Sequence, residues 1–184
     1  MKLTELNCKC LLNMPMLVDV IATTINELDA HFCECYNHYC AFLEKRIVSD
    51  KKDGFELTKS NEGTTSFFGN SIPLKKDFHL SYDISLTQTK KTAPSSFSVV
   101  FGYLIDDTQN SIYFQLFFSE ESDCEEFKNK INQNNIPSNL RYGSDDISVW
   151  VEFTPDENTS IEKIEQCSNI FKEQILIPYI SKFE

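Results

Sequence analysis

Two apolar runs near the middle of the chain constrain its fold more than any other feature. Residues 97–105 and 112–118 are mostly aromatic and aliphatic, and the polar residues 106–111 separate them. Two such runs joined by a short polar segment are typical of a β-hairpin. Because apolar residues occupy odd and even positions alike, we expect both faces of this hairpin to be covered and the hairpin to form the centre of a sheet.

Further strands are expected on both sides of this hairpin. Apolar residues recur at every second position over 78–86 and over 147–153, as in strands with one buried face. Shorter strands are expected at 55–58 and 64–68. Residues 134–144 contain Asn-Asn, Pro137 and Gly143 and are expected to form a loop.

Helical periodicity marks both ends of the chain. From Pro15 to Ile47, apolar residues recur about every 3.6 positions, which predicts one long helix. Residues 159–162 match a capping box, and apolar residues follow at helical spacing until Pro178, which we expect to stop the C-terminal helix. A second capping-box pattern, at residues 122–125, predicts a short helix.

This order of elements predicts an α+β fold. We expect a mainly antiparallel β-sheet of five to six strands, with the long N-terminal helix and the C-terminal helix packed on it. The alternative is a β-sandwich with added helices. A length of 184 residues suits one domain, so residues 1–184 are expected to form a single α+β domain, with 1–12 as a loosely held N-terminal segment.

The charge of the chain narrows the classes of partner. It has 28 acidic and 17 basic residues, and therefore a formal net charge of −11. This charge repels nucleic-acid phosphates and anionic lipids, so we expect no nucleic-acid and no membrane partner and favour a protein with a basic surface. Seven cysteines, an odd number, and the absence of an apolar signal segment favour free thiols in a reducing cytoplasm.

An acidic cluster around the expected short helix is the strongest candidate for a binding surface. Carboxylates stabilise a helix N-terminus, but they also steer a basic protein surface into contact. The single tryptophan, Trp150, is the kind of residue that anchors protein interfaces. We therefore predict a partner-binding site formed by Trp150 and by the acidic cluster, which consists of Glu120, Glu121, Asp123, Glu125 and Glu126.

The densest group of metal-capable side chains lies inside the long N-terminal helix. His31, Cys35 and His38 fall on one helix face, and imidazole and thiolate both suit zinc. Leu28 and Phe42 occupy the same stripe, which is typical of a packed core face, where free cysteine is a common small apolar residue. We expect no cofactor here, and zinc is the ion that these three residues suit if they bind one.

The sequence lacks the patterns of familiar catalytic sites. It contains no Gly-x-Ser-x-Gly, no His-Glu-x-x-His and no glycine-rich phosphate loop. We therefore predict a non-catalytic cytoplasmic protein-binding domain, such as an inhibitor or neutraliser of a basic partner. The alternative is a metal-dependent hydrolase with ligands from the N-terminal Cys and His residues or from loop aspartates such as Asp145 and Asp146.

Overall fold

The computed structural model of the protein describes residues 14–48, 55–60, 66–67, 78–89, 95–105, 109–156 and 159–183. Side chains are described for 23–47, 55–58, 79–89, 95–105, 109–156 and 159–183. The expected N-terminal segment, residues 1–12, lies outside the described residues, and so does most of the expected strand at 64–68.

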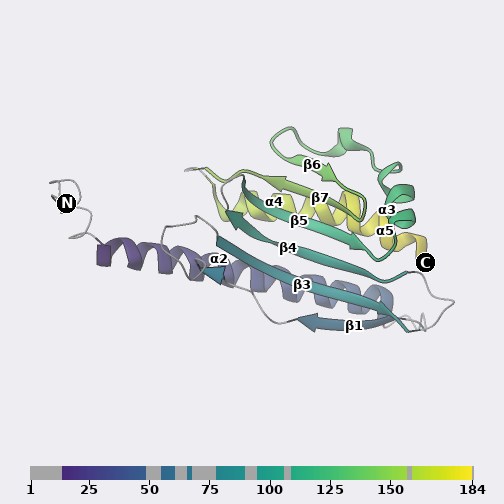
Figure 1. Ribbon diagram of the computed structural model, residues 1–184, viewed down its shortest axis with the longest axis horizontal. Helices are drawn as coiled ribbons and strands as arrows, with labels where there is room; N and C mark the ends of the chain where they lie inside the picture. The colour runs from purple at the N-terminus through teal and green to yellow at the C-terminus, as the bar shows by residue number, and fades with distance from the viewer. Residues whose placement is uncertain are drawn as a thin grey trace, which may run out of the picture.

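One antiparallel sheet organises the fold (Figure 1). Its strands are ordered β1-β3-β4-β5-β7-β6, and a two-residue strand, β2, also pairs with β3. The expected α+β fold with a mainly antiparallel sheet is thus confirmed, and the described strands form one sheet rather than a sandwich. The strands are β1 Phe55–Ser60, β2 Ser66–Phe67, β3 Phe78–Gln88, β4 Phe97–Ile105, β5 Asn110–Phe118, β6 Arg141–Ser144 and β7 Ser148–Phe153.

Two helices from opposite ends of the chain cover the same face of this sheet (Figure 1). Helix α2, Met14–Leu43, contacts β3, and helix α4, Ile161–Phe171, contacts β5 and β7. Both pack through residues at three- and four-residue steps, so the helical period decides which face is buried. The short helix α3, Glu121–Lys128, contacts β5 and β7. No described helix is long and apolar enough to cross a membrane.

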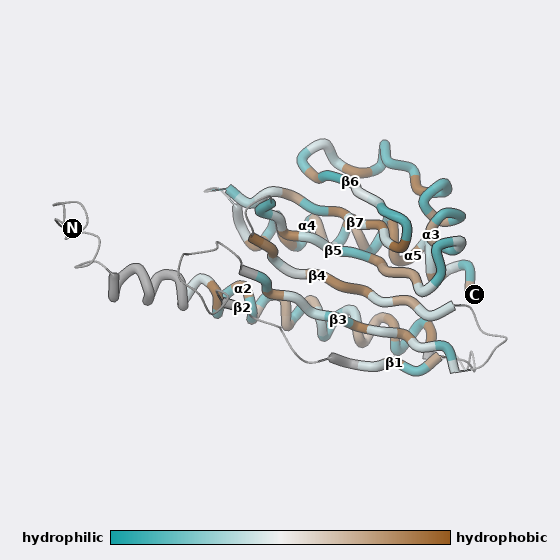
Figure 2. The backbone as a smooth tube through the Cα atoms, viewed as in Figure 1, coloured by the Kyte–Doolittle hydropathy of each residue, from teal (hydrophilic) through white to brown (hydrophobic). Residues whose placement is uncertain are grey.

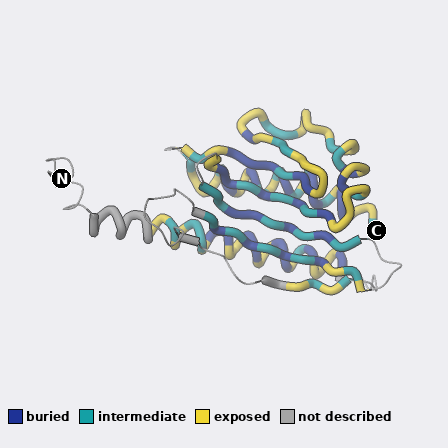
Figure 3. Tube along the Cα trace, in the orientation of Figure 1, coloured by how far each residue is buried: buried dark blue, intermediate teal, exposed yellow. Residues whose placement is uncertain are grey.

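Aromatic side chains fill the space between the helices and the sheet. Phe101 of β4 and Phe114 of β5 stack with ring centroids 5.3 Å apart. Phe32 and Tyr39 of α2 lie 6.1 and 5.5 Å from Phe101, and Phe171 of α4 lies 6.2 Å from Phe114. All five are buried, and this packing joins both helices to the central strands. Hydrophobic and buried stretches of backbone accordingly recur along the central strands and the helices behind them (Figures 2 and 3).

The expectation that both faces of the central hairpin are covered is wrong. Strands β4 and β5 do lie at the centre of the sheet, but burial alternates along them: the side chains toward the helices are buried and most of the others are half-exposed (Figure 3). No described helix lies on the second face, which we call the open face. Large side chains there, such as Tyr113 and Phe117, are only partly covered, by their neighbours within the sheet.

Two local expectations are also corrected. Residues 141–144 form strand β6 and not a loop, because Gly143 leaves room for the indole of Trp150, which would lie 2.3 Å from a Cβ at position 143. Pro178 does not stop the C-terminal helix, which continues as α5, Ile177–Ile180. A π-helical turn, Lys172–Leu176, widens the backbone just before the proline and relieves the clash of its ring with the preceding turn.

The two expected capping boxes are not formed. Helix α3 begins after Glu120 and helix α4 after Ser160, and neither residue makes a side-chain capping hydrogen bond. Thr159 instead bonds through its hydroxyl to the backbone N–H and the carboxylate of Asp156 in the preceding loop. Packing against the sheet therefore holds these helices more than their caps do.

Candidate functional site

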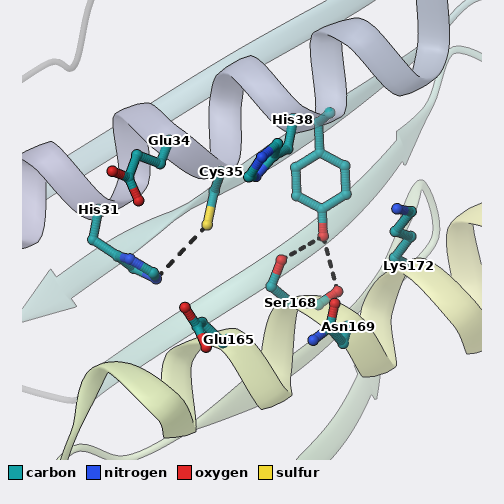
Figure 4. Close-up of a pocket in the computed structure, with 9 residues that line it drawn as sticks. His31, Glu34, Cys35, His38, Glu165, Ser168, Asn169 and Lys172 are labelled. Carbon is teal, nitrogen blue, oxygen red and sulfur yellow. Dashed lines mark hydrogen bonds between the residues drawn. The ribbon is translucent and has the colours of Figure 1, made fainter. Parts of the chain in front are cut away.

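The three candidate metal ligands line a groove between α2 and α4 (Figure 4). The groove has a volume of about 360 Å³, and Glu165 of α4 and Lys172 of the π-helical turn that follows it lie on its opposite side. His31, Cys35 and His38 therefore face the second helix and not the sheet. The spacing of four and three residues does place them on one face, as the sequence suggests.

The groove does not assemble a metal centre. The Nε2 atom of His31 lies 3.8 Å from the Sγ atom of Cys35, whereas His38 lies one turn further along the helix (Figure 4). Within the described ranges, no three His, Cys, Asp or Glu side chains are placed to hold one metal ion. Because structural zinc needs four ligands and catalytic zinc three, the residues as they lie do not fit this ion, and no metal-assisted step follows from them.

The Cys35 thiol is not activated as a nucleophile. Burial, opposed by a hydrogen bond with Ser168 and helped by the nearby carboxylates of Glu165 and Glu34, raises its pKa to about 11, so it is protonated at neutral pH. Beside it, the Tyr39 hydroxyl lies 2.9 Å from the backbone oxygen of Ser168, to which it donates, and equally close to the Ser168 hydroxyl. The groove thus joins α2 to α4 through packing and hydrogen bonds.

Thiol labelling tests this assignment. Cys33 is exposed and Cys35 is buried, two residues apart on α2. At pH 8 a thiol with a pKa of about 11 is only about one-thousandth thiolate, so a brief pulse of iodoacetamide is expected to label Cys33 at least about a hundredfold faster than Cys35. Mass spectrometry of each peptide after the pulse measures both rates. Equal labelling of the two thiols in the folded protein would contradict a buried, protonated Cys35.

The acidic cluster lies on and just before helix α3. Lys128 and Lys130 form salt bridges of 2.5 Å with Glu125 and Glu126, and these hydrogen bonds lower the pKa of both carboxyls. Both glutamate side chains are well exposed, so solvent screens these pairs and they exchange readily for other partners. The remaining members, Glu120, Glu121 and Asp123, form no salt bridge within the described part of the chain.

The turn between β6 and β7 adds two carboxylates beside this cluster. The buried thiol of Cys124 in α3 lies 3.6 Å from the backbone oxygen of Asp145, to which it donates. The backbone N–H of Phe118, at the end of β5, donates to the oxygen of Ile147 at 2.8 Å. These two contacts hold Asp145 and Asp146 next to α3.

A pocket on the open face begins at the same turn. It has a volume of about 330 Å³ and lies over β5, β6 and β7. We call it the Trp150 pocket. Its lining includes Tyr113, Gln115, Arg141, Asp145, Trp150 and Glu152.

A buried carboxylate forms one wall of the Trp150 pocket. The Glu152 side chain is 8% exposed, and its Oε1 atom accepts hydrogen bonds from Nε of Arg141 at 2.9 Å and from Nε1 of Trp150 at 2.9 Å. The Nη2 atom of Arg141 lies 2.7 Å from the same oxygen. A buried charge needs such partners, and they fix both the carboxylate and the indole ring.

A chain of hydrogen bonds forms the opposite wall. The Gln115 amide donates to the Ser148 hydroxyl at 2.8 Å, and that hydroxyl donates to Oδ1 of Asp145 at 2.7 Å. The same Asp145 oxygen accepts the backbone N–H of Ile147, which gives the Asp-stabilised turn common before a strand. The Asp145 carboxylate is therefore held at the rim of the pocket.

Tyr113 extends the polar surface across the sheet. Its hydroxyl lies at hydrogen-bond distance, 3.0 Å, from Nε2 of His79 in β3. Tyr113 pairs with Gly102 of β4, which has no side chain, so the tyrosine ring can cross β4 diagonally towards His79. Burial raises the pKa of Tyr113 to about 12 and lowers the pKa of His79, so both side chains are neutral near pH 7.

The structure places Asp145 between the two predicted parts of the site, because its backbone oxygen accepts a hydrogen bond from Cys124 of α3 and its side chain lines the Trp150 pocket. Sequence reasoning missed Glu152 and Arg141 as site residues. Glu152 lies two positions after Trp150 in an expected strand. Because residues two apart share one face of a strand, the sequence could have indicated that Glu152 lies beside Trp150. Comparisons of the chain with protein-family models, curated proteins and solved structures give no match.

Proposed function

We propose that this protein is a non-catalytic protein-binding domain that holds a partner with a basic surface and thereby inhibits or neutralises it. The binding surface consists of the acidic cluster, the Asp145–Asp146 turn and the Trp150 pocket. In keeping with the odd number of cysteines, we propose that it acts in the reducing cytoplasm.

The position of Asp145 is the observation that carries this proposal. Its backbone oxygen is bonded to α3, and its carboxylate belongs to the Trp150 pocket. The proposed surface therefore links the acidic cluster to the aromatic anchor through Asp145. Such a surface combines long-range attraction, which speeds the capture of a basic protein, with an aromatic contact that slows its release.

The open face of the sheet supports the same proposal. No described helix covers it, and its side chains near β7 are held by hydrogen bonds before any partner binds. A rigid surface loses little conformational entropy on association. A partner would thus meet a surface already arranged for binding.

Charge reversal at the acidic cluster tests the proposed function. The probe is a labelled peptide of alternating arginine and serine, titrated at physiological ionic strength and followed by fluorescence anisotropy. A variant carrying Glu120→Lys, Glu121→Lys and Asp146→Lys is expected to bind it at least about tenfold more weakly, because three attractive contacts become repulsive.

A matched variant separates the site from the net charge. Glu34→Lys, Glu165→Lys and Glu173→Lys change the net charge by the same amount but lie on α2 and on the C-terminal helical segment, away from the proposed surface. This variant is expected to bind within about twofold of the unaltered protein, since distant exposed charges are screened. Equal weakening of both triple variants would show attraction by net charge alone and would overturn the proposal.

A further inference from the structure

Within the described part of the protein, the two carboxylates of the Trp150 pocket each use only one oxygen. All described hydrogen bonds to the Glu152 side chain reach Oε1, and those to the Asp145 side chain reach Oδ1. Neither Oε2 of Glu152 nor Oδ2 of Asp145 accepts a hydrogen bond from the described residues. The pocket therefore retains acceptors for a ligand that carries several donors.

Arg141 shows which donor group this pocket suits. Its guanidinium reaches Glu152 with two nitrogens while its side chain remains 69% exposed and lines the pocket. A guanidinium has five N–H donors in one plane and is less strongly hydrated than an ammonium group. It can therefore pair with a partly buried carboxylate at a smaller desolvation cost than lysine.

Trp150 supplies the remaining contact. Gly143 leaves space for its indole, and the bond from Nε1 to Glu152 fixes the ring. Guanidinium groups stack on indole rings through cation–π attraction, and this contact gains strength where water is excluded. The fixed indole and the two carboxylates thus offer a guanidinium an aromatic surface and hydrogen-bond acceptors within one pocket.

We infer that the Trp150 pocket binds an arginine side chain of the basic partner and selects it over lysine. This inference rests on the proposed function and names the group that the surface recognises. The guanidinium of the partner donates to Glu152 and Asp145 and lies against Trp150, while the acidic cluster attracts the residues around it.

The experiment uses the fluorescence of Trp150, which is the only tryptophan of the chain. The full-length protein is titrated with three peptides that alternate serine with arginine, with lysine or with citrulline. The arginine peptide is expected to shift the Trp150 emission saturably, and the lysine peptide to bind about tenfold more weakly, because it cannot stack or donate in a plane. The uncharged citrulline peptide is expected to produce no shift.

Two variants identify the pocket as the place of binding. Glu152→Gln keeps an acceptor for the Trp150 N–H but removes the charge, and is expected to weaken the arginine peptide at least about tenfold. Asp83→Asn removes one carboxylate from β3, outside the pocket, and is expected to change binding less than about twofold.

Arg141→Ala keeps the inference testable if Glu152→Gln does not fold. This change frees Oε1 of Glu152 from the internal guanidinium, so the arginine peptide is expected to bind about threefold or more tightly. A variant that merely loosened the fold would not bind more tightly.

The outcomes separate this inference from the proposed function. Equal binding of the arginine and lysine peptides, with no effect of Glu152→Gln, would overturn the arginine pocket, while loss of binding on reversal of the acidic cluster would still support the docking surface. No binding of either basic peptide by fluorescence or anisotropy would overturn both.

Discussion

Gly102→Ala is expected to destabilise the protein by about 3 kcal/mol or more, a large share of the 5 to 15 kcal/mol that typically holds a domain folded. A Cβ at position 102 would lie 1.9 Å from the backbone oxygen of Leu80 and 2.9 Å from the Cα of Ser81. Because these atoms belong to the paired strand β3, strands β3 and β4 must separate. Urea unfolding followed by circular dichroism measures the loss.

Gly143→Ala provides the matched control for this prediction. Its Cβ would also meet atoms at close distance, but these belong to the Trp150 side chain and not to backbone, so the indole can turn aside at the expense of its hydrogen bond to Glu152. The expected loss is about 1 kcal/mol, together with a change in Trp150 emission. If Gly143→Ala were the more damaging of the two, the close approach of β3 and β4 at Gly102 would be refuted.

The elements that sequence reasoning found are those in which burial has a simple period. Leu80, Tyr82, Ile84 and Leu86 alternate along β3, and all four are buried. The amphipathic spacing of α2 and α4 likewise matches their buried faces. In these segments one face is buried and the other meets solvent, so apolar residues recur with the period of the strand or helix.

The expectation that both faces of the central hairpin are covered was wrong for a related reason. Val100, Leu104, Tyr113 and Phe117 face away from the helices, yet they are apolar, and a strand with apolar residues on both faces resembles one covered twice. In a wide sheet the inner strands shelter part of each other's surface, so half-buried aromatic residues need no second layer. The number of strands that flank the hairpin cannot be inferred from the residues of the hairpin itself.

The proposed binding surface could be predicted from the sequence only in parts. Carboxylates near α3 and a lone tryptophan are visible in the sequence, but their continuity depends on the contact between Cys124 and Asp145, which are 21 residues apart. Arg141 was hidden because turn-forming residues surround β6, and only the space above Gly143 lets that strand pair with β7. Contacts of this kind arise from tertiary packing, which no local pattern records.

Phe32→Ala is expected to cost about 3 to 5 kcal/mol of unfolding free energy, the usual range for a fully buried phenylalanine. The ring is 0% exposed and lies 6.1 to 6.5 Å from the rings of Tyr82, Phe101 and Phe114. Its removal leaves a cavity between α2 and the central strands. The neighbouring Tyr82 side chain is held by the bond from its hydroxyl to Asp29, so it does not move in to fill that cavity. Urea unfolding by circular dichroism measures the change.

The variant Phe117→Ala provides the matched control and tests whether the open face of the sheet is uncovered. Phe117 lies in β5 like Phe114, but on the open face, where it is only half-buried. Removing a half-buried ring is expected to cost about 1 kcal/mol, since little further apolar surface becomes exposed and no enclosed cavity forms. If Phe117→Ala cost as much as Phe32→Ala, the open face would have to be covered. Because a covered face could not receive a partner, that result would also remove the basis for docking at the Trp150 pocket.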